Sequence, residues 1–590
     1  MSQRRSSRRP VLSVAALLGA LAAAAVTGLA PSAEAQQLRF SATAPGGIAS
    51  TGNTLGLSKA YGLNGPGTQH SIGTFITLDP TLVDDNPIDP ANPWPTNTTW
   101  DWHKNGSAGV LQLPEGATVL YAELVWAGSY RYGAEDVLAN LEDPITLSVA
   151  GDSTFVAPDG QTARTLAESA FSGFAVNYYL RSADVTAFLQ SHGAGTYAVE
   201  GVPATQAATV NTLNAAGWSL VVAYRSDAQP MRNLSVFVGG PFVDEDTEQD
   251  YEVSGFCAPP YGAVEGKVLI SAVEGDANLT GDQLALGRSG TNAFVALSGP
   301  NNPVDNFFCS QVNDADGQAD LLGTFGDANH DPFTGQNIPG GRQSWDLTTV
   351  PVSAAEGHLD NDQKSAVIRT TTTGDSFMPT LVAFQIDVKA PNFSDSTTES
   401  DVPAVQLGDT LAVTATLKNS GQALAANLEV AIPLESGLVL DGFAIDGTPA
   451  NVSANALANG VQVGSLDVNE TVSVRLELHV VAPPANGVDF VFEPTWGHSF
   501  VMCTDQPAID ETYAGPPAEV LFEVVEQGGA GGTPNEGGHG GSTAQLGPAE
   551  IVEEGSCGCQ LPGRSDSGSG PWAVVALGAA AIVLARRRRS

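Results

Sequence analysis

The stretch TVSVRLELHVV, residues 471–481, decides the fold class, because apolar and polar residues alternate strictly along it. The apolar set is Val472, Val474, Leu476, Leu478 and Val480. Successive side chains of a β-strand point to opposite faces, so this pattern predicts an antiparallel strand with one face on a core and the other in water. Similar strands at 410–417 and 428–434 predict a β-sandwich over this region.

The N-terminal part of the chain also favours strands. The run TVLYAELVWA, residues 118–127, is almost continuously apolar and rich in β-branched and aromatic residues, which predicts a buried strand. Turn signals such as Pro45-Gly46-Gly47 break up residues 36–110. One helix is predicted at 182–190, with Ser182 as its N-cap and Gly193 ending it. We therefore expect an all-β chain of tandem β-sandwich domains, immunoglobulin-like or jelly-roll-like, with a signal peptide and a short C-terminal hydrophobic helix.

Composition shifts divide the chain into six parts. A Ser/Thr/Asp run at 394–401 marks one boundary, and a Gly-rich stretch that cannot build a core marks another. The predicted parts are a signal peptide at 1–35, an N-terminal β-rich domain at 36–240, a second β-rich domain at 241–390, an immunoglobulin-like domain at 391–525, a Gly-rich linker at 526–556 and a C-terminal sorting or anchor segment at 557–590.

The N-terminus is typical of a secretory signal. Four arginines precede an apolar run at 11–29, and Ala33 and Ala35 frame a small-x-small cleavage pattern. A permanent N-terminal membrane anchor is the alternative. Because residues 7–12 also resemble a twin-arginine signal, the general secretory and twin-arginine routes both stay open.

The C-terminus combines three elements in order. Cys557 and Cys559 precede a Gly/Ser spacer at 563–570, and an apolar run at 571–585 precedes Arg586, Arg587, Arg588 and Arg589. Fifteen apolar residues are fewer than the roughly 20 that cross a bilayer core, so the tail favours a processed signal over a plain transmembrane anchor. The terminal arginines would stay on the cytoplasmic side.

This tail resembles the myxobacterial C-terminal sorting domain, MYXO-CTERM, over residues 556–590. The resemblance implies recognition by a sorting protease near Cys557 or Cys559, and attachment at the cell surface. The expected partners are thus the export machinery, the sorting protease and the cell envelope, and the expected location is the cell surface or outer envelope.

A second resemblance covers residues 407–440. Gly408-Asp409, Asn419-Ser420-Gly421, Pro433 and Gly437-Leu438 match the repeat found in bacterial surface and adhesion-related proteins, the eleventh domain of unknown function. That resemblance implies an immunoglobulin-like sandwich used as a stalk. Upstream, five pieces resemble ectodomains that precede such repeats: GWSLVVAY (217–224), RNLSVFVG (232–239), VEGD (273–276), DNFF (305–308) and TTTGDSF (371–377).

Charge and cysteine content indicate an extracellular protein. The formal net charge of −39 repels nucleic acid, so no nucleic-acid partner is expected. In an exported chain, Cys257 and Cys309 lie in one predicted domain, and we expect them to form a disulfide.

We find no strong catalytic motif, and the eight histidines are scattered without metal-ligand spacing. The best metal candidate is the calcium-type loop with Asp327, Asn329 and Asp331, for which an ordinary Asx turn is the competing interpretation. Residues 313–317 form a weaker second candidate, and no cofactor other than calcium is expected. These observations predict a non-catalytic surface protein, adhesive or envelope-structural, with a surface glycan or another protein as its class of ligand. The alternative is a secreted carbohydrate-active or other hydrolytic enzyme with a dispersed site in residues 36–390.

Overall fold

The computed structural model describes residues 36–524, apart from 59–71, 86–89, 92, 171–173, 207–212, 245–246, 261, 278, 327–341 and 503–506. Almost all of its regular structure is β-strand, arranged in several sheets, so the predicted all-β fold class is confirmed.

The largest sheet has nine strands. In spatial order they are β11 (Arg164–Thr165), β14 (Tyr178–Asp184), β6 (Thr118–Ser129), β16 (Ala216–Arg225), β1 (Gln37–Thr54), β17 (Met231–Val238), β24 (Met378–Asp387), β19 (Glu265–Val273) and β22 (Trp345–Ser353). The predicted strand at 118–127 is confirmed as β6. All named strand pairs within this sheet are antiparallel.

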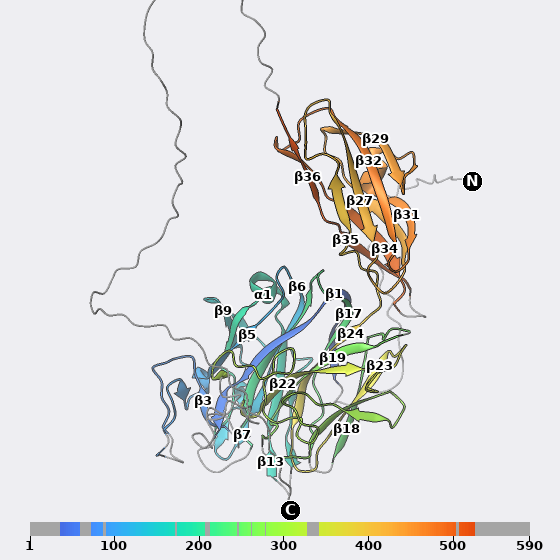
Figure 1. Cartoon of the computed structure of the whole chain (residues 1–590). Helices are drawn as coiled ribbons and strands as arrows, with labels where there is room; N and C mark the ends of the chain where they lie inside the picture. The colour runs from blue at the N-terminus through green and yellow to red at the C-terminus, as the bar shows by residue number, and fades with distance from the viewer. Residues whose placement is uncertain are drawn as a thin grey trace, which may run out of the picture. The chain divides into compact units, whose positions relative to one another are not determined.

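Strand β1 joins the two halves of this sheet (Figure 1). Its first part, up to Pro45, pairs with β17, and its second part, from Gly46 onward, pairs with β16. The Pro45-Gly46-Gly47 signal, predicted to be a turn, therefore lies inside an 18-residue strand. A Cβ at Gly46 would lie 2.0 Å from the carbonyl oxygen of Tyr224, so the close approach of the two strands explains why glycine stands here.

A smaller sheet covers each half of the nine-stranded sheet, with an apolar core between them. The first outer sheet consists of β10 (Asp152–Val156), β9 (Ile145–Val149), β15 (Gly195–Glu200) and β5 (Gly106–Leu111), and the second consists of β18 (Glu248–Ser254), β23 (Ser365–Thr371), β20 (Gln283–Gly287) and β21 (Phe294–Ala296). Short two- and three-stranded additions are β2 (Gly56–Ser58), β3 (Ile72–Ile76), β4 (Thr98–Thr99), β7 (Arg131–Tyr132), β8 (Glu135–Asp136), β12 (Glu168–Ala170) and β13 (Phe174–Val176).

The opposite faces of the two halves share a third apolar core, which we call the central core. It contains Val125 of β6, Val236 of β17 and Leu269 of β19. Trp345 of β22 is fully buried here, and a Cβ at Gly217 of β16 would lie 2.3 Å from its indole ring. The predicted boundary between residues 240 and 241 thus separates the two outer sheets, whereas the nine-stranded sheet is continuous across it.

Residues 391–524 form a separate sandwich around one core. Its five-stranded sheet consists of β25 (Thr397–Ser400), β27 (Thr410–Lys418), β32 (Thr471–Val480), β29 (Leu438–Ile445) and β30 (Thr448–Pro449). A four-stranded sheet consists of β31 (Val461–Leu466), β28 (Ala425–Ala431), β34 (Thr495–Phe500) and β35 (Ile509–Ala514). A three-stranded sheet consists of β26 (Ala404–Val405), β36 (Ala518–Phe522) and β33 (Asp489–Phe492). In β32 the five apolar residues of the alternating stretch are all buried, as predicted.

Helices are few and short in the described part of the chain: α1 (Thr186–His192), α2 (Ala454–Asn459), and the 3-10 turns η1 (Trp102–Lys104) and η2 (Leu138–Asn140). Helix α1 begins four residues later than predicted, because residues up to Asp184 pair with β6. Ser182 is therefore a strand residue and not an N-cap, while Gly193 ends the helix as predicted. None of the described helices has the length and apolar character needed to cross a bilayer.

Candidate functional site

Several predicted site residues lie outside the described residues. These are the signal-cleavage residues Ala33 and Ala35, the calcium-loop residues Asp327, Asn329 and Asp331, and the tail residues Cys557, Cys559, Arg586, Arg587, Arg588 and Arg589.

The predicted disulfide between Cys257 and Cys309 does not form. Cys257 is disulfide-bonded, but Cys309 is a free and buried thiol. The two residues lie in different environments: the backbone N–H of Cys257 donates to Asn233 Oδ1 at 2.8 Å, and the Cys309 thiol donates to the carbonyl oxygen of Asn301 at 3.4 Å. A shared predicted domain did not bring them together because the chain between them passes through several strands of two sheets.

The weaker acidic loop at 313–317 is an Asx-type turn. Asp314 Oδ1 accepts from the backbone N–H groups of Asp316 and Gln318, both at 2.9 Å. Asp316 pairs instead with Lys267, whose Nζ lies 3.2 Å from its Oδ1. The carboxylates of this loop therefore bind the protein's own donors.

Four aromatic residues of the N-terminal region, Trp94, Trp100, Trp102 and Tyr130, are of the residue types that are enriched at binding interfaces. Trp94 and Tyr130 are buried core residues and Trp102 is partly buried, whereas Trp100 is 50 % exposed. These residues do not make one exposed aromatic surface.

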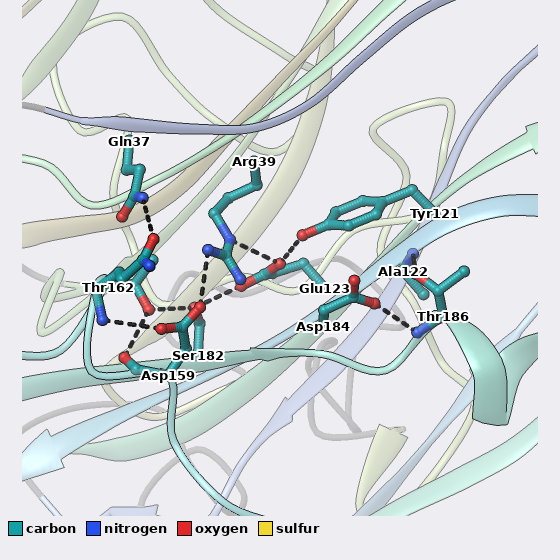
Figure 2. A network of polar contacts seen from close by, with 11 residues as sticks. Gln37, Arg39, Tyr121, Ala122, Glu123, Asp159, Thr162, Ser182, Asp184 and Thr186 are labelled. Carbon is teal, nitrogen blue, oxygen red and sulfur yellow. Dashed lines mark hydrogen bonds and ion pairs between the residues drawn. The ribbon is translucent and has the colours of Figure 1, made fainter. Parts of the chain in front are cut away.

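A buried ion pair lies beside the central core (Figure 2). Glu123 stands in the middle of β6, and its side chain is fully buried. Its carboxylate accepts from Arg39 Nε at 3.2 Å and from Ser182 Oγ at 2.5 Å, and it also contacts the hydroxyl of Tyr121. Arg39 Nη1 in turn lies 2.9 Å from Asp159 Oδ2.

The electrostatics of this Arg39–Glu123 cluster are those of a closed network. Burial raises the pKa of Glu123, and the hydrogen bonds from Ser182 and Tyr121 and the charge of Arg39 oppose that shift. Burial, followed by the adjacent Glu123 carboxylate, also raises the pKa of Tyr121, so its hydroxyl remains a donor. Both carboxylate oxygens of Glu123 are hydrogen-bonded, and the cluster ties β1, β6 and β14 together. The arrangement is suited to holding strands.

A second polar group, which we call the carboxyl cluster, contains five acidic residues from four segments. Glu274 and Asp276 follow β19, Asp282 precedes β20, Asp346 lies in β22 and Asp375 precedes β24. Their exposed fractions range from 0 % to 8 %.

Short hydrogen bonds connect these segments. The backbone N–H of Asp276 donates to Asp375 Oδ2 at 3.0 Å, and the N–H of Phe308 donates to Asp282 Oδ2 at 2.6 Å. Asp346 Oδ1 accepts from the N–H of Gln311 at 3.1 Å. The stretches VEGD, DNFF and TTTGDSF, about 100 residues apart from first to last, thus meet at one place.

The backbone around the carboxyl cluster adopts a rare conformation. Glu274, Ser310 and Ser344 have φ values of 84°, 56° and 55°. The N–H of Glu274 donates to the carbonyl oxygen of Ser344 at 3.0 Å, and the N–H of Ser344 donates to Ser310 Oγ at 2.9 Å. Such residues cost about 1–3 kcal/mol each and persist only where surrounding contacts hold them, so this region is tightly determined by its packing.

Burial dominates the charge state of the carboxyl cluster. It raises the pKa of Asp276 and of Asp282 to about 7, and it raises the pKa values of Glu274, Asp346 and Asp375 well above their usual range. Repulsion from neighbouring carboxylates adds to the shift at Glu274, Asp346 and Asp375. Sequence reasoning missed both this cluster and Glu123; a single acidic residue within the apolar run at 118–127 was the one local signal for Glu123.

No family model matches the chain, and no curated protein matches it. Among solved structures, the fold is similar to the N-terminal domain of the Streptococcus gordonii adhesin Sgo0707, with 8 % identity, coverage of 71 % of this chain and 92 % of that one, and a TM-score of 0.22. It is also similar to a putative membrane anchored protein from Corynebacterium diphtheriae, with 7 % identity, coverage of 82 % and 97 %, and a TM-score of 0.16. At these TM-scores the likenesses carry no argument about function.

Proposed function

We propose that this chain is an exported, non-catalytic surface protein with an adhesive or envelope-structural role, held at the cell surface by its C-terminal tail. The observation that carries the proposal is that a buried charged side chain, Glu123, forms an ion pair between strands. Arg39 of β1 pairs with Glu123 of β6 and with Asp159 in the segment before β11, so these charges connect three segments and strengthen a scaffold.

The burial of six acidic groups removes them as candidates for the catalytic pair of a glycoside hydrolase. Hydrolysis of a glycosidic bond generally needs two carboxyl groups that reach the substrate. Glu123 and the five residues of the carboxyl cluster are at most 8 % exposed, so a sugar ring does not reach them in this conformation.

The surface location rests on the sequence of the tail. A Gly-rich stretch, residues 526–556, precedes it, and this composition is typical of a linker between a folded domain and an anchor.

The test is localisation of the full chain and of a variant lacking residues 556–590, each with an epitope tag in the Gly-rich segment. Surface protease treatment of intact cells should release the tag from the full chain, and the truncated chain should appear in the medium. A matched variant with Cys557→Ser and Cys559→Ser keeps the apolar run and the arginines, and therefore separates processing from simple membrane insertion. Free secretion of both chains, or retention of both inside the cell, would contradict the proposal.

A further inference from the structure

The carboxyl cluster is not explained by a scaffold role. Charged side chains are expensive to bury without a partner of opposite charge. The Arg39–Glu123 cluster meets this requirement with a guanidinium group. Burial, neighbouring carboxyl groups and backbone N–H donors act most strongly on Glu274, Asp346 and Asp375, and the hydroxyl of Tyr178 also acts on Glu274.

Within the part of the chain that the structure describes, three carboxyl oxygens of this cluster have no hydrogen-bond partner: Glu274 Oε2, Asp282 Oδ1 and Asp346 Oδ2. Their residues are 3 %, 0 % and 1 % exposed, so bulk water does not compensate for the missing bonds. Asp346 Oδ2 points toward Gly275, where a Cβ would lie only 2.5 Å away from it. A proton on such an oxygen would remove its charge and supply the donor that a neighbouring oxygen lacks.

Among the described residues, no three acidic, histidine or cysteine side chains are arranged to hold a metal ion. The unpartnered oxygens Glu274 Oε2, Asp282 Oδ1 and Asp346 Oδ2 are each positioned to carry a proton. We propose that the carboxyl cluster holds protons in the folded protein, so that the half of the fold built on β17, β24, β19 and β22 becomes less stable as the solution turns from acidic to mildly alkaline.

Two further titratable groups that face the cluster, Tyr178 and Cys309, stay uncharged over this range. Tyr178 of β14 faces Glu274, and burial raises its pKa well above the usual value. Burial likewise raises the pKa of the Cys309 thiol, which faces Asp346 and Asp282. Asp305, which lies near Asp282, is a further acidic neighbour and adds to the repulsion.

The sign of the dependence follows from the direction of the shifts. Asp276 and Asp282 release their protons near pH 4 when the chain is unfolded and near pH 7 when it is folded. The folded state therefore binds more protons between these values, and stability falls as pH rises from about 4 to just above 7. Below about pH 4 this contribution is fully present.

The experiment is hydrogen exchange with mass spectrometry on the full chain at pH 5 and pH 8, corrected for intrinsic exchange. We expect protection of peptides from β19 and β22 to fall at least about tenfold between the two values, with no matching change in β32, because each pKa unit of differential proton binding is a factor of ten. In the variant Asp276→Asn with Asp282→Asn, that fall should be smaller. The control Glu265→Gln alters an exposed carboxylate at the start of β19 and should behave as the parent does.

A second measurement needs no variant, in case the double substitution does not fold. Difference infrared spectroscopy of the full chain at pH 6 should show the carbonyl stretch of protonated carboxyl groups, although exposed carboxylates are ionised there. Equal protection at pH 5 and pH 8, or the lack of this infrared band, would overturn the proposal. Recovery of protection at pH 8 on adding Ca²⁺ would also overturn it, since a metal ion would then be the compensating species.

Discussion

Removing Arg39 tests whether the buried ion pair holds the first half of the fold together. In Arg39→Met the side chain keeps a long apolar stem, but Glu123 loses the cation at 3.2 Å from its carboxylate. Ser182 and Tyr121 remain as hydrogen-bond donors. We expect the variant to fold and to be less stable than the parent.

The size of the loss has an upper bound, because Glu123 can take up a proton instead of remaining charged. From its reference pKa of 4.5, holding the group neutral at pH 7 costs about 3.4 kcal/mol, at 1.36 kcal/mol per pKa unit. At pH 5 the same cost is about 0.7 kcal/mol. The first value agrees with the roughly 3–5 kcal/mol measured when one partner of a buried ion pair is removed.

The assay is hydrogen exchange of peptides from β6 and β14 at both pH values, with β32 as an internal reference. The free energy of opening should drop by at most about 3 kcal/mol at pH 7, since burial already raises the pKa of Glu123 in the parent, and by clearly less at pH 5. The double variant Arg39→Met with Glu123→Gln removes the carboxylate as well, so its loss should not grow from pH 5 to pH 7. An equal loss in Arg39→Met at pH 5 and pH 7 would refute the reasoning.

Two further experiments test the packing of Gly217 against Trp345 and the pairing state of Cys257 and Cys309. Gly217→Ala should destabilise the protein by about 1–3 kcal/mol in urea denaturation, because its Cβ would overlap the buried Trp345 ring; Gly160→Ala, where no atom lies within 4 Å, should leave stability unchanged. Maleimide labelling of the unfolded, unreduced chain should modify Cys309 and spare Cys257, and modification of Cys257 would contradict the observed disulfide.

Local patterns predicted individual strands well and their connections poorly. The alternation at 471–481 and the apolar run at 118–127 became β32 and β6, because burial on one or both faces imposes a pattern on adjacent residues. Pro45-Gly46-Gly47 was misread as a turn because the partner strands of β1 lie far along the chain. Propensity carries no information about such pairing.

The polar clusters were hidden for the same reason. Asp276, Asp346 and Asp375 are separated by strands, and only the order β24-β19-β22 in the sheet brings their segments together. The cysteine prediction was wrong because it used proximity along the chain, whereas Cys257 and Cys309 have different neighbours in space.

The position of β1 also bears on how the chain reaches its folded state. Gly46 pairs with Arg225 and Pro45 pairs with Met231, so the contact order of this first strand is very high. Until β16 and β17 have been synthesised and delivered, both edges of β1 present unpaired N–H and C=O groups. This topology favours two folding errors: slow pairing of β1 with β16 and β17, and exchange of β1 between two chains. A nascent chain that stalls before residue 216 would be most exposed to both errors.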